Sequence, residues 1–175
     1  MVTLVIGGAA SGKSEYAEQC LLAGSSGKRW YIATLHPLDE ESEHRIRKHR
    51  AARAGRGFTT IECYTGLRRV TLPEPGDVLL DCMGNLLANE LYEPDGAGAS
   101  AVAAILDGID QLIPQCRSLV IVTNEVGAGG TAYEGDTLTY LQFMGELNQG
   151  LAARADRVVE IAAGLPLVYK GGESE

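Results

Sequence analysis

The first residues that could do chemistry lie in a short stretch near the N-terminus. Gly7-Gly8-Ala9-Ala10-Ser11-Gly12-Lys13-Ser14 has the GxxxxGKS spacing of a phosphate-binding loop (P-loop), and it lies between an apolar run and a helical pattern, as such a loop requires. The glycines let backbone N–H groups turn toward phosphates, Lys13 supplies a charge at the β- and γ-phosphates, and the Ser14 hydroxyl can bind Mg²⁺. The stretch therefore predicts an enzyme that uses ATP or GTP with Mg²⁺, with Lys13 as a catalytic residue.

Two carboxylates follow apolar runs and could complete the predicted magnesium site. Asp81 ends the run 77–81, and Glu125 follows the run 118–123. A P-loop usually works with an acid at the end of a neighbouring strand, which holds Mg²⁺ partly through water. Asp81 has the cleaner pattern and is the first choice as a metal ligand beside Ser14, with Glu125 as the second candidate.

The segment 39–54 is unusually rich in charge, and Ile46 is its only large aliphatic residue. Arg45, His49 and Arg53 follow one another at intervals of four, so a helix would place them on one face. A neutral imidazole can attack phosphorus while nearby guanidinium groups neutralise the phosphates. His49 is therefore a candidate nucleophile for nucleotidyl transfer, and a solvated helix face with a passive histidine is the alternative.

The order of apolar runs and helical patterns predicts the fold class. Strands are expected at 2–6, 29–34, 58–62, 77–81 and 118–123, with helices after the P-loop, over 39–54, from near 84, over 102–113 and over 138–151. The runs 157–164 and 166–170 predict two final strands, which could form an antiparallel hairpin across 164–166. Alternating strands and helices indicate a single α/β domain over 1–175, P-loop NTPase-like, with a central mostly parallel sheet and helices on both faces.

Composition limits which classes of partner and which cellular compartment we expect for this protein. The 175-residue chain has a net charge of −8, which disfavours nucleic acid and anionic membranes as partners, and its apolar runs are too short for membrane insertion. The N-terminus has no basic leader, and the four cysteines are too widely spaced for a zinc site. We therefore expect a cytoplasmic protein with reduced thiols.

Several stretches together resemble one family, the bifunctional adenosylcobinamide kinase/adenosylcobinamide-phosphate guanylyltransferases of cobalamin biosynthesis. The resemblance lies in GGAASGKSEYAE (7–18), YIAT (31–34), the charged segment with Arg45-Ile46 and His49, LLDC (79–82), VTNEVGAG (122–129) and NQGLAARAD (148–156). It spans nearly the whole chain, so it is far more specific than the P-loop alone.

The resemblance implies two reactions and a set of site residues. It implies phosphorylation of adenosylcobinamide with ATP or GTP, and transfer of GMP from GTP through a guanylylated His49 to adenosylcobinamide phosphate, which gives adenosylcobinamide-GDP. It also implies a homo-oligomer, a trimer by analogy with the family. Besides the P-loop, it implies nucleotide contacts from Thr34, Leu35, His36, Arg50, Ala51, Ala52, Arg53, Glu62 and Asp81.

The sequence departs from the family pattern in places that leave other functions open. Ala10 stands where the family tends to have arginine, Phe58 where it has tryptophan, and 130–146 contains no lysine or arginine. The alternatives are a P-loop kinase of another small alcohol or nucleotide, and a nucleotide-binding regulatory protein without transfer activity. The departures concern corrinoid specificity and assembly more than nucleotide chemistry, because the P-loop and His49 are intact.

Overall fold

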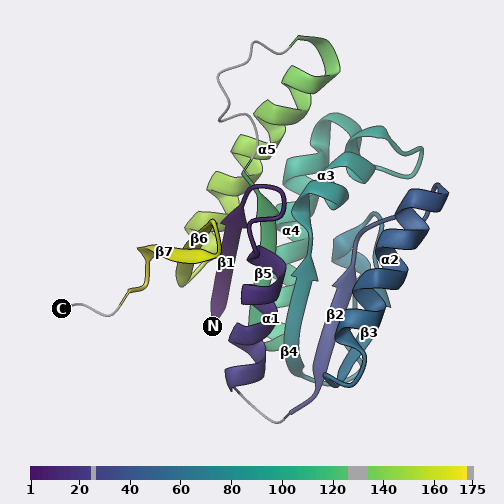
Figure 1. The fold of residues 1–175 in the computed structure, drawn as a ribbon. Coiled ribbons are helices and arrows are strands. Elements are labelled where there is room, and N and C mark those ends of the chain that lie inside the picture. The colour runs from purple at the N-terminus through teal and green to yellow at the C-terminus, as the bar shows by residue number, and fades with distance from the viewer. Residues whose placement is uncertain (25–26, 126–133, 173–175) are drawn as a thin grey trace.

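The computed structural model of the chain describes residues 1–24, 27–125 and 134–172, and within these ranges the strands form one seven-stranded sheet with the order β3-β2-β4-β5-β1-β6-β7 (Figure 1). The strands are β1 (Val2–Gly7), β2 (Arg29–Ala33), β3 (Phe58–Glu62), β4 (Gly76–Asp81), β5 (Cys116–Asn124), β6 (Arg157–Ala162) and β7 (Leu165–Lys170). The helices are α1 (Lys13–Gly24), α2 (Glu40–Arg53), α3 (Met83–Tyr92), α4 (Ala101–Leu112) and α5 (Gly135–Arg154), with short 3₁₀ turns at Leu67–Arg69, Gly98–Ser100 and Ile113–Gln115.

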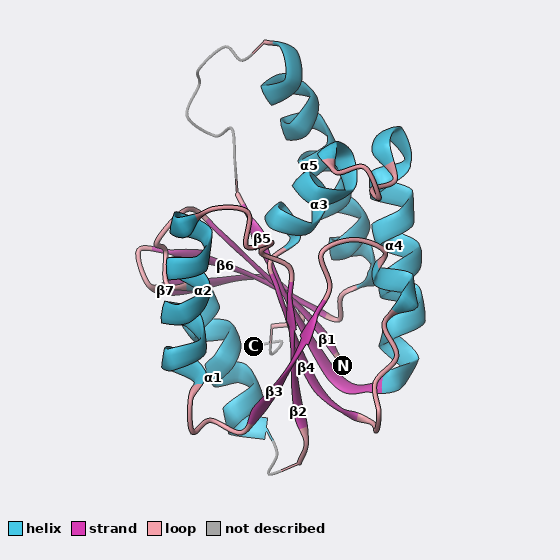
Figure 2. Cartoon of the chain, turned by 90° about the vertical axis from the view of Figure 1, so that its right-hand side faces the viewer, coloured by secondary structure: helices cyan, strands magenta, loops and turns pink. Residues whose placement is uncertain are grey.

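The sheet buries both faces, as the continuous apolar strands predict. Neighbouring residues of one strand enter different cores: Leu4 packs in the larger cluster with α3, α4 and α5, whereas Val5 packs in the smaller cluster with α1. Figure 2 shows α1 and α2 on one side of the sheet and α3, α4 and α5 on the other. The predicted α/β architecture with helices on both faces is confirmed.

Parallel pairing aligns the carboxyl ends of the central strands. β1 pairs in parallel with β5 and β6, and its last residue, Gly7, lies opposite Asn124. β2 pairs in parallel with β3 and β4, which sets Ala33 level with both Glu62 and Asp81. The P-loop, Asp81 and Glu62 therefore meet at one edge of the sheet, although they are far apart in sequence.

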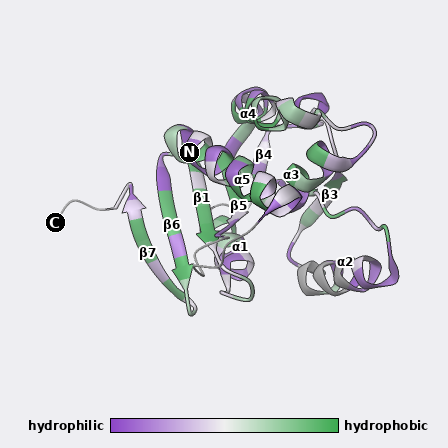
Figure 3. Cartoon of the chain, turned by 90° about the horizontal axis from the view of Figure 1, so that it is seen from above, coloured by the Kyte–Doolittle hydropathy of each residue, from purple (hydrophilic) through white to green (hydrophobic). Residues whose placement is uncertain are grey.

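The charged segment forms α2, and no side chain that the structure describes in this helix is buried. The Asp39 carboxylate caps the helix by accepting a hydrogen bond from the Ser42 backbone N–H at 2.7 Å, and acidic residues fill the first turn. Figure 3 shows α2 at the side of the molecule, hydrophilic where it is coloured. In α2 the structure does not describe the side chains at positions 45, 48, 49, 52 and 53.

The two C-terminal strands pair antiparallel, but their turn lies earlier than the sequence predicts. The turn is Ala163-Gly164, both with positive φ, and Leu165 and Pro166 already pair with β6 instead of forming the turn. Two residues with positive φ give the twist that a tight hairpin needs, and alanine is an unusual residue there. Within the described residues, no helix is long and apolar enough to cross a membrane.

Candidate active site

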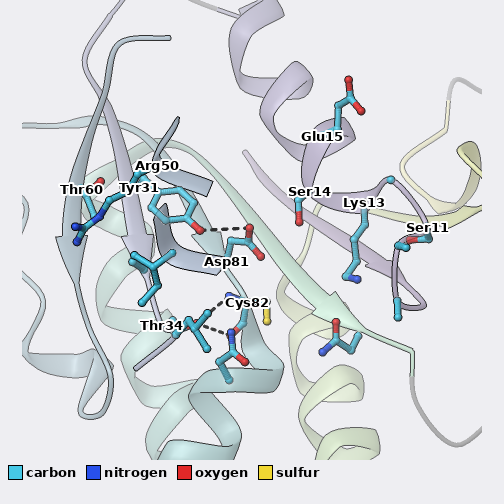
Figure 4. Close-up of a pocket in the computed structure, with 18 of the residues that line it drawn as sticks. Ser11, Lys13, Ser14, Glu15, Tyr31, Thr34, Arg50, Thr60, Asp81 and Cys82 are labelled. Atoms are coloured by element: carbon cyan, nitrogen blue, oxygen red, sulfur yellow. Dashed lines mark hydrogen bonds between the residues drawn. The ribbon is translucent and has the colours of Figure 1, made fainter. Parts of the chain in front are cut away.

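A cleft of about 570 Å³ opens at the carboxyl ends of β1, β2, β4 and β5, a size typical of small-molecule sites. Figure 4 shows Ser11, Lys13 and Ser14 on one side of it, Arg50 and Thr60 on the other, and Asp81 between them. The lining residues come from the P-loop, three strand ends, α2, β3 and α3: Ala9, Ala10, Ser11, Gly12, Lys13, Ser14, Glu15, Tyr31, Ala33, Thr34, Leu35, Ile46, Arg50, Thr60, Glu62, Tyr64, Asp81, Cys82, Asn85, Asn124 and Glu125.

The P-loop adopts a tight turn that its glycines permit. A Cβ at Gly7 would lie 2.4 Å from Ser11 Oγ and 2.9 Å from the Ile161 carbonyl oxygen, so a larger residue there would force its neighbours to shift. Gly12 has φ +92°, and Ala10 also has a positive φ of 56°. The turn keeps the first residues of α1 at the cleft wall, where the helix N-terminus favours an anion.

Two polar groups of the loop are arranged as an anion would require. Lys13 Nζ donates a 2.9 Å hydrogen bond to the Gly8 carbonyl, within the loop itself. Ser11 Oγ is buried and makes no hydrogen bond within the described part of the chain. A buried hydroxyl without a partner is costly, and a phosphate oxygen in the loop could supply that partner.

The two candidate acids both line the cleft but differ in burial. Asp81 is 9 % exposed, and the Tyr31 hydroxyl donates to its Oδ2 at 3.4 Å. Glu125 is exposed, and its backbone N–H donates to the Gly7 carbonyl at 3.1 Å, which fixes it beside the start of the P-loop. Asp81 therefore has the more defined position, while the structure leaves Glu125 close enough to remain a second candidate.

The oxygen donors in the cleft suit Mg²⁺ that arrives with a nucleotide. Ser14 and Asp81 offer a hydroxyl and a carboxylate in the same cleft, the hard ligands that Mg²⁺ prefers. Among the described residues, no group of three or more acidic, histidine or cysteine side chains could hold a metal by itself. The donor set fits an ion that keeps several waters and shares phosphate oxygens with the protein.

The far wall of the cleft contains a charged pair. Arg50 of α2 donates from Nη2 to Glu62 Oε1 of β3 at 2.6 Å, and both side chains are about half exposed. Burial raises the pKa of Tyr64, and its hydrogen bond to Glu62 raises that pKa further. Two residues that the sequence predicts to contact nucleotide thus contact each other across the cleft wall.

Of the predicted residues after β2, Thr34 lines the cleft and also joins two strands, whereas His36 does not line it. Thr34 Oγ1 donates to the Cys82 carbonyl and accepts from the Cys82 N–H, both at 2.8 Å, which ties the ends of β2 and β4 together. His36 is absent from the lining: its Nδ1 is 2.8 Å from Glu93 Oε1, and its ring stacks on Tyr64 with centroids 4.4 Å apart. Leu35 also lines the cleft.

The remaining predicted residues do not all fall on the cleft. Gly7 and Gly8 shape the P-loop without lining the cleft, and Ala51 is exposed on α2 and does not line the cleft either. The side chains of His49, Ala52 and Arg53 lie outside the described part of the structure, so the predicted nucleophile is placed only as a backbone position in α2.

The structure adds residues that sequence patterns did not single out as site residues. Tyr31, Tyr64, Cys82, Asn85 and Asn124 all line the cleft. Burial raises the pKa of the Cys82 thiol to about 11, so it is protonated at neutral pH. Tyr31 precedes a strand end by two residues, and Cys82 and Asn124 lie at strand ends, a position that parallel sheets give to ligand sites and that could have identified them.

The arrangement has a phosphate loop on one side, an acid in the middle and cationic α2 on the other. Such a cleft can hold a nucleoside triphosphate with its phosphates at the P-loop and the rest of the nucleotide facing α2. These parts are what phosphoryl transfer requires.

Comparison with known proteins assigns the chain to one family, which is far more specific than a P-loop fold. Residues 3–169 match a family model described as cobinamide kinase / cobinamide phosphate guanyltransferase. The chain is 35% identical to the bifunctional adenosylcobalamin biosynthesis protein CobU of Salmonella typhimurium, over 97% of this chain and 100% of that protein. It is 34% identical to CobU of Escherichia coli, with the same coverage, and 34% identical to the bifunctional adenosylcobalamin biosynthesis protein CobP of Pseudomonas aeruginosa, over 98% of both chains.

A solved structure supports the fold alone. The flagellar accessory protein FlaH from Methanocaldococcus jannaschii superposes with a TM-score of 0.52 at 12% identity, over 99% of this chain and 81% of that one. The match covers the whole chain, so it confirms the α/β architecture without bearing on the reaction.

Proposed function

The chain belongs to the cobinamide kinase / cobinamide phosphate guanylyltransferase family and is a bifunctional enzyme of adenosylcobalamin biosynthesis, and we propose that both of its reactions take place in the cleft between the P-loop and α2. A kinase of an unrelated alcohol and a non-catalytic regulatory protein are set aside by the match over nearly the whole chain. We take residues 1–175 as one catalytic domain.

In the kinase reaction, the P-loop binds ATP or GTP. Lys13 neutralises the β- and γ-phosphates, and Ser14 and Asp81 would hold Mg²⁺, which would offset the charge that develops during transfer. The hydroxyl oxygen of adenosylcobinamide attacks the γ-phosphorus and its proton passes to solvent water. The bond from that phosphorus to the bridging oxygen breaks, and ADP or GDP leaves. The joint placement of Lys13, Ser14 and Asp81 around one cleft supports this assignment.

In the guanylyltransferase reaction, an imidazole nitrogen of His49 attacks the α-phosphorus of GTP. A P–N bond forms, the bond from that phosphorus to the bridging oxygen breaks, and pyrophosphate leaves. A phosphate oxygen of adenosylcobinamide phosphate then attacks the same phosphorus, the P–N bond breaks, and adenosylcobinamide-GDP is released with the histidine regenerated. Two displacements at phosphorus divide one difficult transfer into easier steps.

One observation carries the assignment of His49: α2 contributes directly to the cleft. Ile46 and Arg50 of this helix line the same cleft as the P-loop, and position 49 lies between them in sequence. Neighbours three and four apart share one side of a helix, and position 49 is three after Ile46. Arg50 could neutralise phosphate charge once a ligand separates it from Glu62.

The test is covalent labelling with GTP that carries the label on its α-phosphate. We expect wild type to retain label that is stable in base and released by acid, as a phosphoramidate would be, and His49→Ala to retain none. His44→Ala is the matched control, because His44 is an exposed histidine of the same helix and does not line the cleft. Equal labelling of His49→Ala and wild type would disprove the covalent role of His49.

We also propose that the enzyme is a cytoplasmic homo-oligomer, a trimer by analogy with its family. β7 supports an assembly because it is an edge strand that leaves large apolar side chains exposed, among them Leu165, Leu167 and Tyr169. Light scattering of the purified protein should give a mass of about three chains, and a mass of one chain would contradict the proposal.

A further inference from the structure

Asn124 ends β5, the strand that lies between the P-loop strand and the strand that carries Asp81. The parallel register places Asn124 opposite Gly7, at the start of the P-loop, and places Asp81 opposite Val122, two residues earlier on β5. Asn124 also lines the cleft. It therefore lies between the loop that binds phosphates and the acid that would hold Mg²⁺.

Hydrogen bonds on both sides fix the backbone around Asn124. Its carbonyl accepts from Asn148 Nδ2 of α5 at 3.2 Å, and the next residue, Glu125, donates from its N–H to the Gly7 carbonyl at 3.1 Å. Asn148 is itself held by the buried Thr123, whose hydroxyl donates to Asn148 Oδ1 at 2.6 Å. The end of β5 is therefore a firm support for one side chain, as a group that must meet a substrate at a defined place requires.

The side chain of Asn124 packs against the start of α3. A Cβ at Gly84 would collide with Asn124 Nδ2, so the glycine there lets the carboxamide approach the helix. The Tyr140 hydroxyl of α5 donates to the Gly84 carbonyl at 3.2 Å, which fixes this turn of α3. Among the residues that the structure describes, none forms a hydrogen bond with the carboxamide itself, so its N–H groups and its oxygen are available to a ligand.

The charges near the start of α3 identify this end of the cleft. Burial, and after it the Asp81 carboxylate, raises the pKa of the Cys82 thiol at the N-terminus of α3, while the Lys13 ammonium acts in the opposite direction. Figure 4 shows Lys13 pointing toward the side of the cleft that holds Asp81 and Cys82. The lysine of a P-loop serves the β- and γ-phosphates. The terminal phosphate of a bound nucleotide therefore belongs at this end of the cleft, where the Asn124 carboxamide packs.

We propose that the Asn124 carboxamide donates a hydrogen bond to the γ-phosphate of ATP or GTP and is a catalytic residue of the kinase reaction. The inference rests on the proposed function, because it takes the P-loop as the site of the phosphates. During transfer the acceptor oxygen bonds to the γ-phosphorus, the hydroxyl proton passes to water, and ADP or GDP leaves. The carboxamide keeps its own protons and stabilises the oxygens of the transferred group. It also distinguishes a triphosphate from a diphosphate, which lacks the group that it binds.

The experiment compares two nucleotides that differ only in the γ-phosphate. These are the α,β-methylene analogues of GTP and GDP, whose bridge blocks displacement at the α-phosphorus, and they are titrated with Mg²⁺ into the full-length protein. We expect Asn124→Ala to bind the GTP analogue roughly tenfold more weakly than wild type, and the GDP analogue within about twofold of wild type. Asn124→Asp should weaken the GTP analogue further, because a carboxylate repels phosphate. The kinase kcat of Asn124→Ala should fall roughly 100-fold, as loss of one donor to a transition state does.

Gln142→Ala is the matched control. It removes an exposed carboxamide of α5 that does not line the cleft, and it should leave both affinities unchanged. The inference is overturned if Asn124→Ala binds the GTP analogue as wild type does, or if it loses affinity for both analogues equally. Intact binding of the GDP analogue also shows that the variant keeps a folded nucleotide site. Failure of wild type to bind either analogue would instead refute the proposed function, and the wild-type titrations alone reveal that result.

Discussion

At the scale of single residues, three charged side chains of the cleft have partners within the protein. Arg50 and Glu62 contact each other at 2.6 Å, and Lys13 bonds to the Gly8 carbonyl at 2.9 Å. An exposed ion pair such as Arg50–Glu62 contributes only about 0–1 kcal/mol to folding. These side chains can therefore change partner when a nucleotide enters, with little effect on the stability of the fold.

We predict that Arg50→Ala weakens binding of GTP by roughly tenfold, because one charge-assisted hydrogen bond to phosphate is lost. Its free energy of unfolding should change by less than about 1 kcal/mol, since the pair is half exposed. Isothermal titration with GTP and urea unfolding measure the two quantities.

Arg47→Ala is the control for this substitution. Arg47 belongs to the same helix and pairs with Glu43 at 3.5 Å, but it does not line the cleft. Its affinity for GTP should equal that of wild type. If both arginine variants bind GTP equally well, Arg50 has no part in the nucleotide site.

At the scale of elements, the P-loop depends on close approach between backbones. Gly7 ends β1, and any Cβ there would enter the space of Ser11 and of the Ile161 carbonyl on β6. Gly8 has nothing within 4 Å of the same added atom. Gly7 therefore leaves no free space for a side chain, whereas Gly8 does.

We predict that Gly7→Ala destabilises the protein by about 1–3 kcal/mol, as overpacking does, and lowers nucleotide affinity by displacing the loop. Gly8→Ala should keep the wild-type free energy of unfolding. Urea unfolding of both variants tests this pair, and equal stability of the two would show that the loop relaxes around the new methyl group.

At the scale of the whole molecule, buried thiols make folding sensitive to alkaline pH. Burial, with the nearby Glu90 carboxylate, raises the pKa of Cys63 from 9.0 to about 11. Below pH 9 the thiol is protonated in both states. Between pH 9 and 11 only the unfolded chain loses this proton, so the native state loses stability as the pH rises.

We predict that this thiol alone lowers the free energy of unfolding by about 1.4 kcal/mol between pH 8 and pH 10. Cys63→Ala removes that contribution, so its loss of stability over the same interval should be smaller by that amount. Burial also raises the pKa of Cys116 and Tyr140 to about 12. Both groups are present in wild type and in Cys63→Ala, so their contributions cancel in the comparison. An identical decrease in both proteins would mean that Cys63 titrates normally.

The sequence by itself determined the P-loop, the α/β class and the family resemblance. Those conclusions rest on local patterns: the spacing of Gly12 and Lys13, the alternation of apolar runs, and the contiguous charge of 39–54. The hairpin turn was misplaced because Ala163 gives no signal for the positive φ that it adopts.

Only the tertiary structure decided which distant residues meet. The tertiary fold sets Asp81 and Glu62 at the same cleft as the P-loop, stacks His36 on Tyr64, and joins Glu18 to Arg56 across 38 positions. Strand order and side-chain pairing follow from how two apolar faces are buried at once, which depends on the whole chain. No local pattern contains that information, because each contact gains its free energy from residues far away in sequence.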